Sequence, residues 1–404
     1  MKRIFRNCLL ATLALIMSTA AIAQDKKLSA DELIEMTGQT SLNALAKGDY
    51  QKALDARLSQ LQLIENTRGK IDSTYCNALI FAGKCYVRLQ KSDAAVRALE
   101  EATLIYGNNF SRDDREYAIM LDNLSVYLAI EKRYEESLAK ADSSLAIFTK
   151  IPELAISADM SAVLIHVAES DYYLEKYKEA TIYQIRALNI IKQMYGEHSD
   201  SYVSELEYLE EYQELNGEKE KAQQTREKVE RLKKEIEDGV VDWPDLSPVK
   251  DAEDARTRRF DAARMADYYT SHYITATKMN EVAVFLFTWT IQSDQCHIAL
   301  GENEAKLLAD DKARAYYSAF IASICRDAVR DGKEEYTEEV YTDAMVCALN
   351  YYTHNKKYTG KVKFLENLIK TYNKNPDNLF KTLSDYYRKL KEHADKNGNE
   401  TIGK

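Results

Sequence analysis

Two stretches of the sequence have the same order of residue types: EKRYEESLAKADSSLAIF, beginning at Glu131, and EKYKEATIYQIRALNII, beginning at Glu175. In each, a tyrosine is followed three residues later by a small side chain. The spacing extends through the first half of the chain, where equivalent positions lie 42, 42, 43 and 42 residues apart. These positions are Tyr50, Ser92, Tyr134, Tyr177 and Lys219. A near-constant period over several units predicts stacked structural repeats.

Small residues recur where two antiparallel helices would cross. They stand three residues after each position of the period, at Ala53, Ala95, Ser137, Ala180 and Ala222. A single helical hairpin cannot bury its apolar face alone, so each pair needs its neighbours. The chain also has only 13 Gly and 4 Pro in 404 residues, which is low for a protein with sheets and tight turns. The fold class predicted is all-α.

Several of these segments resemble the tetratricopeptide repeat (TPR) family. The resemblance is carried by GKCYVRLQKSDAA from Gly83 and by KRYEES and EKYKEA. A period of about 42 rather than 34 residues is similar to the kinesin-light-chain type of repeat. YGEHSDSY at Tyr195–Tyr202 is similar to the inter-repeat loop of that type, although it is one residue short and lacks the usual proline. The resemblance covers about residues 30–235 and implies a right-handed superhelix of antiparallel helix pairs that binds proteins or peptides.

The N-terminus has the pattern of a secretory signal peptide. Three basic residues precede an apolar run over Cys8–Met17, and Ala21–Ala23 supplies small residues before a cleavage site at Gln24. The rival reading is a membrane anchor, but the run is shorter than the roughly 20 residues that a bilayer span needs. We expect cleavage of residues 1–23 and secretion, best suited to a bacterial periplasm.

The rest of the chain divides into four parts. We expect a TPR-like solenoid of about five repeats over 28–238, a linker over 239–250, a second α-helical domain over 251–395, and a flexible tail over 396–404. The last repeat, from Gly217, has lost its aromatic position and is mostly charged, as a capping helix must be to keep a solenoid soluble. The linker GVVDWPDLSPV holds two of the four prolines, and Trp243 is expected to pack against a neighbouring helix.

The second half resembles no family that we recognise. VAVFLFTWTI at Val282–Ile291 predicts a central core helix, with a buried strand as the alternative. Tyrosine doublets begin at Tyr268, Tyr316, Tyr351 and Tyr386. They fit either degenerate hairpins that continue the solenoid or amphipathic rings at half-buried positions of a tyrosine-rich chain. The sequence leaves open whether this half stacks on the repeats or forms its own bundle.

The cysteines indicate no disulfide framework. Cys76 and Cys85 are nine residues apart on one expected helix, roughly 13 Å, which is too far for a disulfide. We expect buried thiols, with one pair among Cys296, Cys325 and Cys347 left open.

The net charge and the missing motifs argue against nucleic-acid binding, a membrane span and catalysis. The formal net charge is −10, and no basic stripe with interleaved aromatics is present, so nucleic acid is not an expected partner. After the signal peptide no segment has the length of a membrane span. HExxH, GxSxG and phosphate-binding glycine loops are missing. The sequence therefore predicts no catalytic, cofactor-binding or metal-binding residue, and no enzyme.

A binding face follows from the repeat alignment. Gly83 aligns with Ser41, Ser125, Ala168 and Glu210, and the family resemblance implies that flanking positions line a concave groove. The predicted partner-binding residues are Gln39, Lys84, Arg88, Asn123, His166, Glu169, Tyr173, Tyr208 and Glu211. Cations lie early in this groove and acids late, which would orient a polar peptide or helix. The alternative is an ordinary solvated face.

The sequence favours a non-catalytic scaffold that binds a protein or peptide. A second hypothesis is binding of a ligand, for example a glycan, by the aromatic-rich C-terminal half. A third is an enzyme whose site in that half uses residues distant in sequence. Neither the partner nor the oligomeric state can be predicted.

Overall fold

The computed structural model describes residues 28–296, 298 and 301–396. The predicted signal peptide, 1–23, and the tail from residue 397 onward lie outside the described residues. Within the described part, helices are the only regular structure apart from turns, so the all-α prediction is confirmed. The chain forms two compact units, Met1–Ile190 with Glu205–Glu227, and Ile191–Ser204 with Lys228–Lys404.

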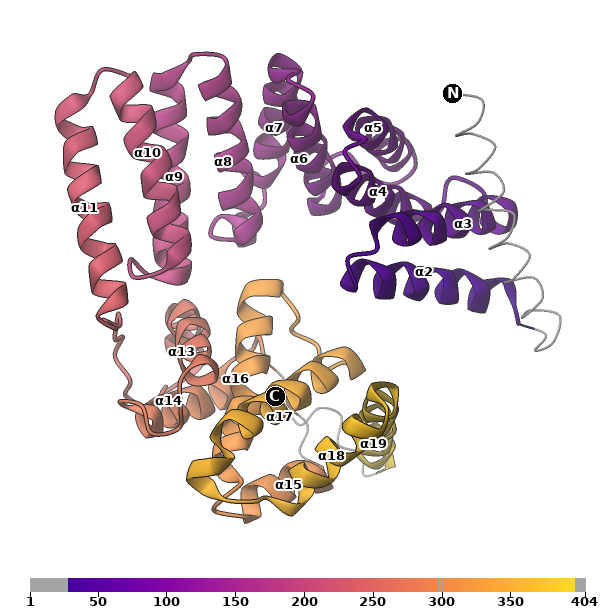
Figure 1. The fold of residues 1–404 in the computed structure, drawn as a ribbon, viewed down its shortest axis with the longest axis vertical. Helices are drawn as coiled ribbons and strands as arrows, with labels where there is room; N and C mark the ends of the chain where they lie inside the picture. The colour runs from indigo at the N-terminus through magenta and orange to yellow at the C-terminus, as the bar shows by residue number, and fades with distance from the viewer. Residues whose placement is uncertain (1–27, 297, 299–300, 397–404) are drawn as a thin grey trace. The chain divides into compact units, whose positions relative to one another are not determined.

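Helical hairpins build the repeat half of the chain (Figure 1). The first helix of each, called helix A, is α2 (Ala30–Ala46), α4 (Ser73–Arg88), α6 (Arg115–Ile130), α8 (Ala158–Tyr173) or α10 (Asp200–Leu215). The second, helix B, is α3 (Tyr50–Arg68), α5 (Ser92–Asn109), α7 (Tyr134–Phe148), α9 (Tyr177–Tyr195) or α11 (Lys219–Glu237). A short 3-10 turn, η1 (Pro152–Leu154), precedes α8. Helices α3, α5 and α7 also pack against the helix A that follows each of them. The predicted TPR-like stacking of helix pairs is confirmed.

The sequence period coincides with the start of every helix B. Tyr50, Ser92, Tyr134, Tyr177 and Lys219 are the first residues of α3, α5, α7, α9 and α11. The small residues one turn later, from Ala53 to Ala222, are at most 1% exposed. Helix contacts explain this burial: the Ser137 hydroxyl of α7 donates to the Ser125 carbonyl of α6 at 2.8 Å.

Each turn between helix A and helix B contains a residue in the left-handed region, two positions before helix B. The φ angles are 73° at Gly48, 57° at Gln90, 61° at Lys132, 61° at Glu175 and 79° at Gly217. Left-handed backbone favours glycine because a Cβ crowds the following carbonyl. Three of the five turns nevertheless carry a side chain there, so tertiary packing sets the turn geometry.

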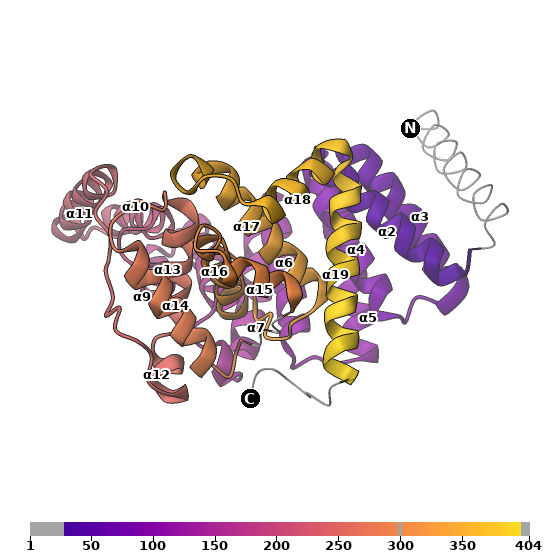
Figure 2. The same ribbon diagram turned by 90° about the horizontal axis from the view of Figure 1, so that it is seen from below.

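The second unit is a helical bundle with its own core. Besides the end of α9, the start of α10 and the end of α11, its helices are α12 (Ala252–Thr257), α13 (Arg259–Ser271), α14 (Met279–Gln292), α15 (Glu302–Ala309), α16 (Arg314–Asp331), α17 (Glu338–Thr359), α18 (Lys363–Lys374) and α19 (Pro376–Lys396). Helix α16 contacts α13, α14, α15 and α17, whereas α19 contacts α17 and α18 (Figure 2). Because α16 packs on a helix far before it in sequence, these helices do not stack hairpin by hairpin as the repeats do.

Tyrosine doublets supply much of this core. Tyr316 makes edge-to-face contacts with Tyr351 at 6.1 Å and Tyr352 at 5.0 Å between ring centroids. Tyr269 lies 5.3 Å from Tyr351. The doublets therefore serve as packing residues between α13, α16 and α17.

The structure of α14 agrees with the prediction of a helix but not with the prediction of a central position. VAVFLFTWTI is helical, as predicted, and Trp289 is fully buried with its indole N–H donating to the Ala255 carbonyl at 2.9 Å. However, Val284, Phe287 and Ile291 are exposed. The prediction of a central helix was wrong, because only one face of α14 meets the core.

The segment between α11 and α12 is held at two points. Trp243 packs edge-on against Tyr268 at 4.9 Å, as expected for the linker. Asp242 accepts from the His198 ring nitrogen Nδ1 at 2.6 Å, and His198 Nε2 pairs with Glu235 at 2.9 Å. The predicted linker bounds, 239–250, fall in this helix-free segment, but the domain limits stay a prediction.

Five cysteines of the described residues are free thiols, four of them buried and Cys347 partly so. Burial raises the pKa of Cys76 to about 11, which keeps that thiol protonated and unreactive. No described helix combines the length and apolarity required to cross a bilayer.

Candidate functional site

An open face runs across the five A helices. Two rows of residues flank the small side chains that pack against helix B, and the rows are three residues apart, so both lie on one side of each helix. One row is Gln39, Phe81, Asn123, His166 and Tyr208, and the other is Leu42, Lys84, Val126, Glu169 and Glu211. None of the ten is buried, whereas Ser41, Ser125 and Ala168 between the rows are fully buried. We call these two rows, with Arg88 and Tyr173 one turn further on, the helix A face.

Cations occupy the early part of the helix A face. Lys84 and Arg88 are one turn apart on α4, both are exposed, and neither forms an ion pair within the described residues. Beside them the guanidinium of Arg57 lies 3.9 Å from the centre of the Phe81 ring. Burial lowers the pKa of Arg57 to about 10, so this group is still a cation at neutral pH. The early part therefore carries positive charge that no described carboxylate neutralises at close range.

Amides in this face are partly engaged by their own helices. The Asn123 side-chain N–H donates to the Ile119 carbonyl at 2.9 Å, and the Gln39 amide donates to Asn43 at 3.2 Å. The oxygen of Asn123 and its second amide N–H are left for a partner. Asn123 can thus accept from a peptide N–H and donate to a peptide carbonyl.

Aromatic rings cover the late part of the face. Tyr173 stacks on Tyr134 with centroids 4.5 Å apart, and Tyr172 lies edge-on to Tyr173 at 5.2 Å. Tyr212 lies 5.2 Å from Tyr172 and 6.5 Å from Tyr208. Tyr173 and Tyr208 are 51% and 47% exposed. These rings present a connected surface with two exposed faces.

Carboxylates surround the same tyrosines. The hydroxyl of Tyr172 donates to Glu211 at 2.7 Å, and this bond, with burial, raises the pKa of Tyr172 to about 12. Burial raises the pKa of Glu169. Burial also raises the pKa of Glu205, and the nearby Glu169 adds to that shift. The late part is therefore an acidic and aromatic surface.

One ion pair connects two A helices within this surface. His166 Nδ1 of α8 lies 2.8 Å from the Asp122 carboxylate of α6. Burial by itself would lower the pKa of His166, but the hydrogen bond and charge of Asp122 outweigh it, so the net shift is upward. His166 is consequently more often protonated than a free imidazole at neutral pH.

The structure brings the predicted residues together in two groups. Lys84 and Arg88 share α4, while five others lie on the neighbouring helices α8 and α10: His166, Glu169, Tyr173, Tyr208 and Glu211. Sequence reasoning missed Asp122, Tyr134, Glu205 and Tyr212. The repeat alignment also places Tyr172 in this groove, beside Tyr173, whereas Tyr134 was considered only as a position of the repeat period. Their role in binding stays a prediction.

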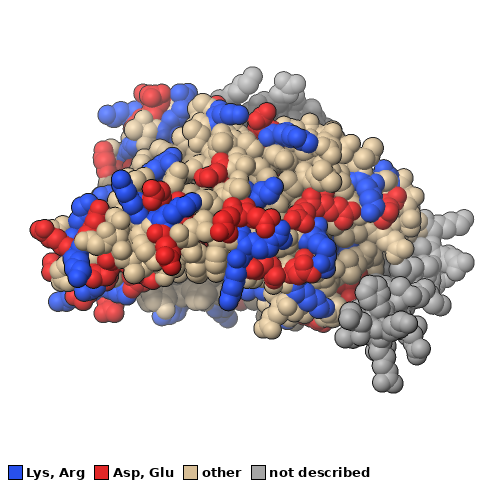
Figure 3. Space-filling model, turned by 90° about the horizontal axis from the view of Figure 1, so that it is seen from above, with Lys and Arg blue, Asp and Glu red and all other residues tan. Residues whose placement is uncertain are grey.

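Two features of the structure concern metal binding and nucleic-acid binding. The described residues contain no group of three His, Cys, Asp or Glu side chains that could hold a metal ion. Lys, Arg, Asp and Glu are interspersed over the face of the molecule in Figure 3, without an extended Lys/Arg area. On that face, the distribution does not favour a phosphate backbone as partner.

No protein-family model and no curated protein matches the sequence. Among solved structures, the chain is similar to BtubC (BKLC) from P. vanneervenii, with 18% identity, 59% of this chain and 94% of that chain covered, and a TM-score of 0.48. It is also similar to a putative kinesin light chain with TPR-like repeats from Podosopora anserina, with 14% identity, coverage of 50% and 96%, and a TM-score of 0.46. For MamA the identity is 12%, the coverage 53% and 99%, and the TM-score 0.40.

These similarities are to TPR-like repeat proteins. Because the TM-scores are below 0.5, the architecture is best judged from the chain's own helix pairs. Solenoids of this kind present extended surfaces to their partners, so the architecture supports a protein–protein interaction scaffold in general terms.

Proposed function

We propose that this protein is a non-catalytic, secreted scaffold of the bacterial periplasm that binds a protein or peptide along its helix A face. Secretion is inferred from the N-terminal sequence pattern. The absence of recognisable catalytic motifs supports a scaffold over an enzyme. The proposal names the helix A face as the binding surface and a polar peptide or helix as the occupant.

The separation of charge along the helix A face carries the proposal. Lys84 and Arg88 are exposed cations without an ion pair in the described part of the chain, although the chain as a whole is acidic. Some exposed cations of the repeats pair with a carboxylate, as Arg133 does with Glu136 at 2.7 Å, whereas others of the described residues, such as Lys52 and Lys178, do not. Two adjacent unpaired cations on an open helix face are available for a partner's carboxylates.

The late part of the face complements a different segment of the same partner. Glu169, Glu211 and the Tyr173 ring offer carboxylates and an aromatic face, both of which attract a Lys or Arg side chain. A peptide with acidic residues toward one end and basic residues toward the other would bind in one direction. The reverse direction would place like charges together, which is costly.

The experiment is affinity capture from envelope extract with the mature protein as bait. We expect at least one defined protein to be enriched by the wild type and lost with Lys84→Glu/Arg88→Glu. The matched control is Lys52→Glu/Lys178→Glu, which changes the net charge equally at exposed positions of helices α3 and α9. Capture that survives the α4 reversal, or that both double variants abolish equally, contradicts the assignment of the face.

A further inference from the structure

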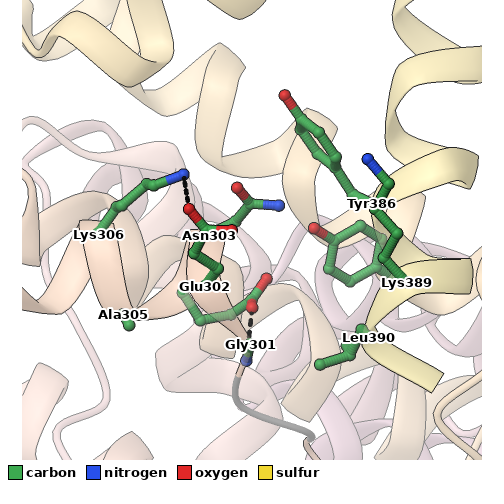
Figure 4. A pocket seen from close by; sticks show the side chains of 10 residues that line it. Gly301, Glu302, Asn303, Ala305, Lys306, Tyr386, Lys389 and Leu390 are labelled. Carbon is green, nitrogen blue, oxygen red and sulfur yellow. Dashed lines mark hydrogen bonds and ion pairs between the residues drawn. The ribbon is translucent and has the colours of Figure 1, made fainter. Parts of the chain in front are cut away.

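The second unit contains a pocket that the scaffold function does not use. Its volume is about 600 Å³, and α15, α17 and α19 supply its walls (Figure 4). That volume is within the range of roughly 300–1,000 Å³ found for small-molecule sites. The lining combines carboxylates, lysines, an amide and tyrosine rings.

Glu304 is the most informative residue of this pocket. Glu304 is only 1% exposed, and one oxygen of its carboxylate accepts from the Gly301 N–H at 2.8 Å. The other oxygen, Oε1, is buried and makes no hydrogen bond of normal length in the described part of the chain, although the hydroxyl of Tyr341 on α17 interacts with this carboxylate and by itself would lower its pKa. A buried acceptor left fully unsatisfied costs about 1–3 kcal/mol, and Glu304 bears part of that cost, so a donor in the pocket that reaches this oxygen would bind favourably. Burial outweighs the effect of Tyr341 and raises the pKa of Glu304 overall, and a hydroxyl group can pair with either the charged or the neutral form.

Charge in the pocket is balanced. Glu302 and Glu304 contribute two carboxylates, and Lys306 and Lys389 contribute two ammonium groups. Lys306 pairs with Glu302 at 2.8 Å. When both carboxylates are ionised, neither an anion nor a cation gains net attraction from such a lining, which favours a neutral ligand.

The remaining lining offers both hydrogen bonding and an apolar face. Asn303 can donate and accept, and Tyr386 lies across the pocket from it on α19 (Figure 4). A tyrosine ring provides a flat apolar surface with a polar tip. Paired donors and acceptors beside such a ring match a molecule with several hydroxyl groups on one edge and C–H groups on its face.

We propose that this pocket binds a neutral polyhydroxylated ring, such as a mono- or disaccharide. Glu304 Oε1 and the Asn303 amide would contact hydroxyl groups, and the sugar ring would lie against Tyr386. This site is independent of the helix A face.

The test is calorimetric titration of the full mature protein with glucose, galactose, N-acetylglucosamine, maltose and cellobiose. Inorganic phosphate and tetramethylammonium serve as charged probes. We expect at least one sugar to saturate with a dissociation constant of about 1 mM or tighter. Lys84→Glu/Arg88→Glu should leave this affinity unchanged, because those residues belong to the helix A face.

Single substitutions test whether the sugar binds in this pocket. Tyr386→Ala and Asn303→Ala should each weaken the sugar by about tenfold, equivalent to about 1.4 kcal/mol, and Tyr386→Phe should retain most of the affinity. Tyr372→Ala removes a more exposed tyrosine of α18, which does not line the pocket, and this variant should bind as the wild type does. The proposal is overturned if no sugar saturates, if only phosphate or tetramethylammonium binds, or if folded Asn303→Ala and Tyr386→Ala proteins keep wild-type affinity.

Discussion

Gly83→Ala should destabilise the protein although alanine is the better helix former. Gly83 lies on α4 where this helix meets α5 and α6. A Cβ at this position would be 2.6 Å from Leu99 Cδ1 and 3.1 Å from Tyr127 Cε2. Leu99 is fully buried, so its side chain cannot swing into solvent to make room.

The two opposing effects can be compared. Alanine gains about 1 kcal/mol of helix propensity over glycine, whereas an additional methyl group in a packed core costs about 1–3 kcal/mol. Distances below 3.0 Å place this site at the upper end of the cost, so we expect a net loss of about 1–2 kcal/mol.

Urea unfolding followed by circular dichroism measures the change. Asn77→Ala, at an exposed position of the same helix, is the control and should be neutral or slightly stabilising. Leu99→Ala removes the obstructing methyl groups, so Gly83→Ala should cost less in that background by at least about 0.5 kcal/mol. If Gly83→Ala stabilises the wild type as much as Asn77→Ala does, α4 and α5 do not approach closely at this crossing.

Three further results are expected. Lys132→Gly should increase the free energy of unfolding by about 0.5–1 kcal/mol, and so raise the urea midpoint, because Lys132 is in the left-handed region. A lowered midpoint would contradict the turn assignment. Burial lowers the pKa of His198, but its hydrogen bonds to Asp242 and Glu235 outweigh this and raise it overall. The stabilisation by these bonds is complete below the unfolded pKa of about 6.5 and is lost as pH rises through the folded pKa. The difference in stability between wild type and His198→Gln should therefore shrink with rising pH. A difference that grows would show that the bonds of His198 to Asp242 and Glu235 do not stabilise the fold. Tyr173→Ala should weaken the captured partner by about tenfold while Tyr173→Phe retains binding, as measured by calorimetry; equal affinity for all three proteins would remove the aromatic surface from the binding face.

The repeat half could be predicted from sequence because its constraints are local and recur. A small residue is needed at every helix crossing, so Ser137 and Ala180 reveal the period and the helix boundaries. The conformation of the turns was harder to predict from the sequence. Gln90, Lys132 and Glu175 are not residues that indicate a left-handed backbone, and only their equivalence to glycines in the other turns identifies them.

Contacts between distant segments were not predictable. Asp122 and His166 pair across 44 residues, and the pocket beside Glu304 depends on α15 and α19 meeting at Tyr386. Neither arrangement leaves a spacing pattern in the sequence. Helix α14 shows the opposite difficulty: its apolar composition indicated a central helix, but hydropathy does not tell how many neighbours a helix has.

We propose above that the helix A face binds its partner through separated charges. The most direct measurement is a calorimetric titration of the captured partner into the wild type, Lys84→Glu/Arg88→Glu and the control Lys52→Glu/Lys178→Glu, each at two salt concentrations. We predict that only the α4 double reversal weakens binding, by about tenfold or more, and that added salt weakens the wild-type complex. Equal affinities for all three proteins would contradict the account.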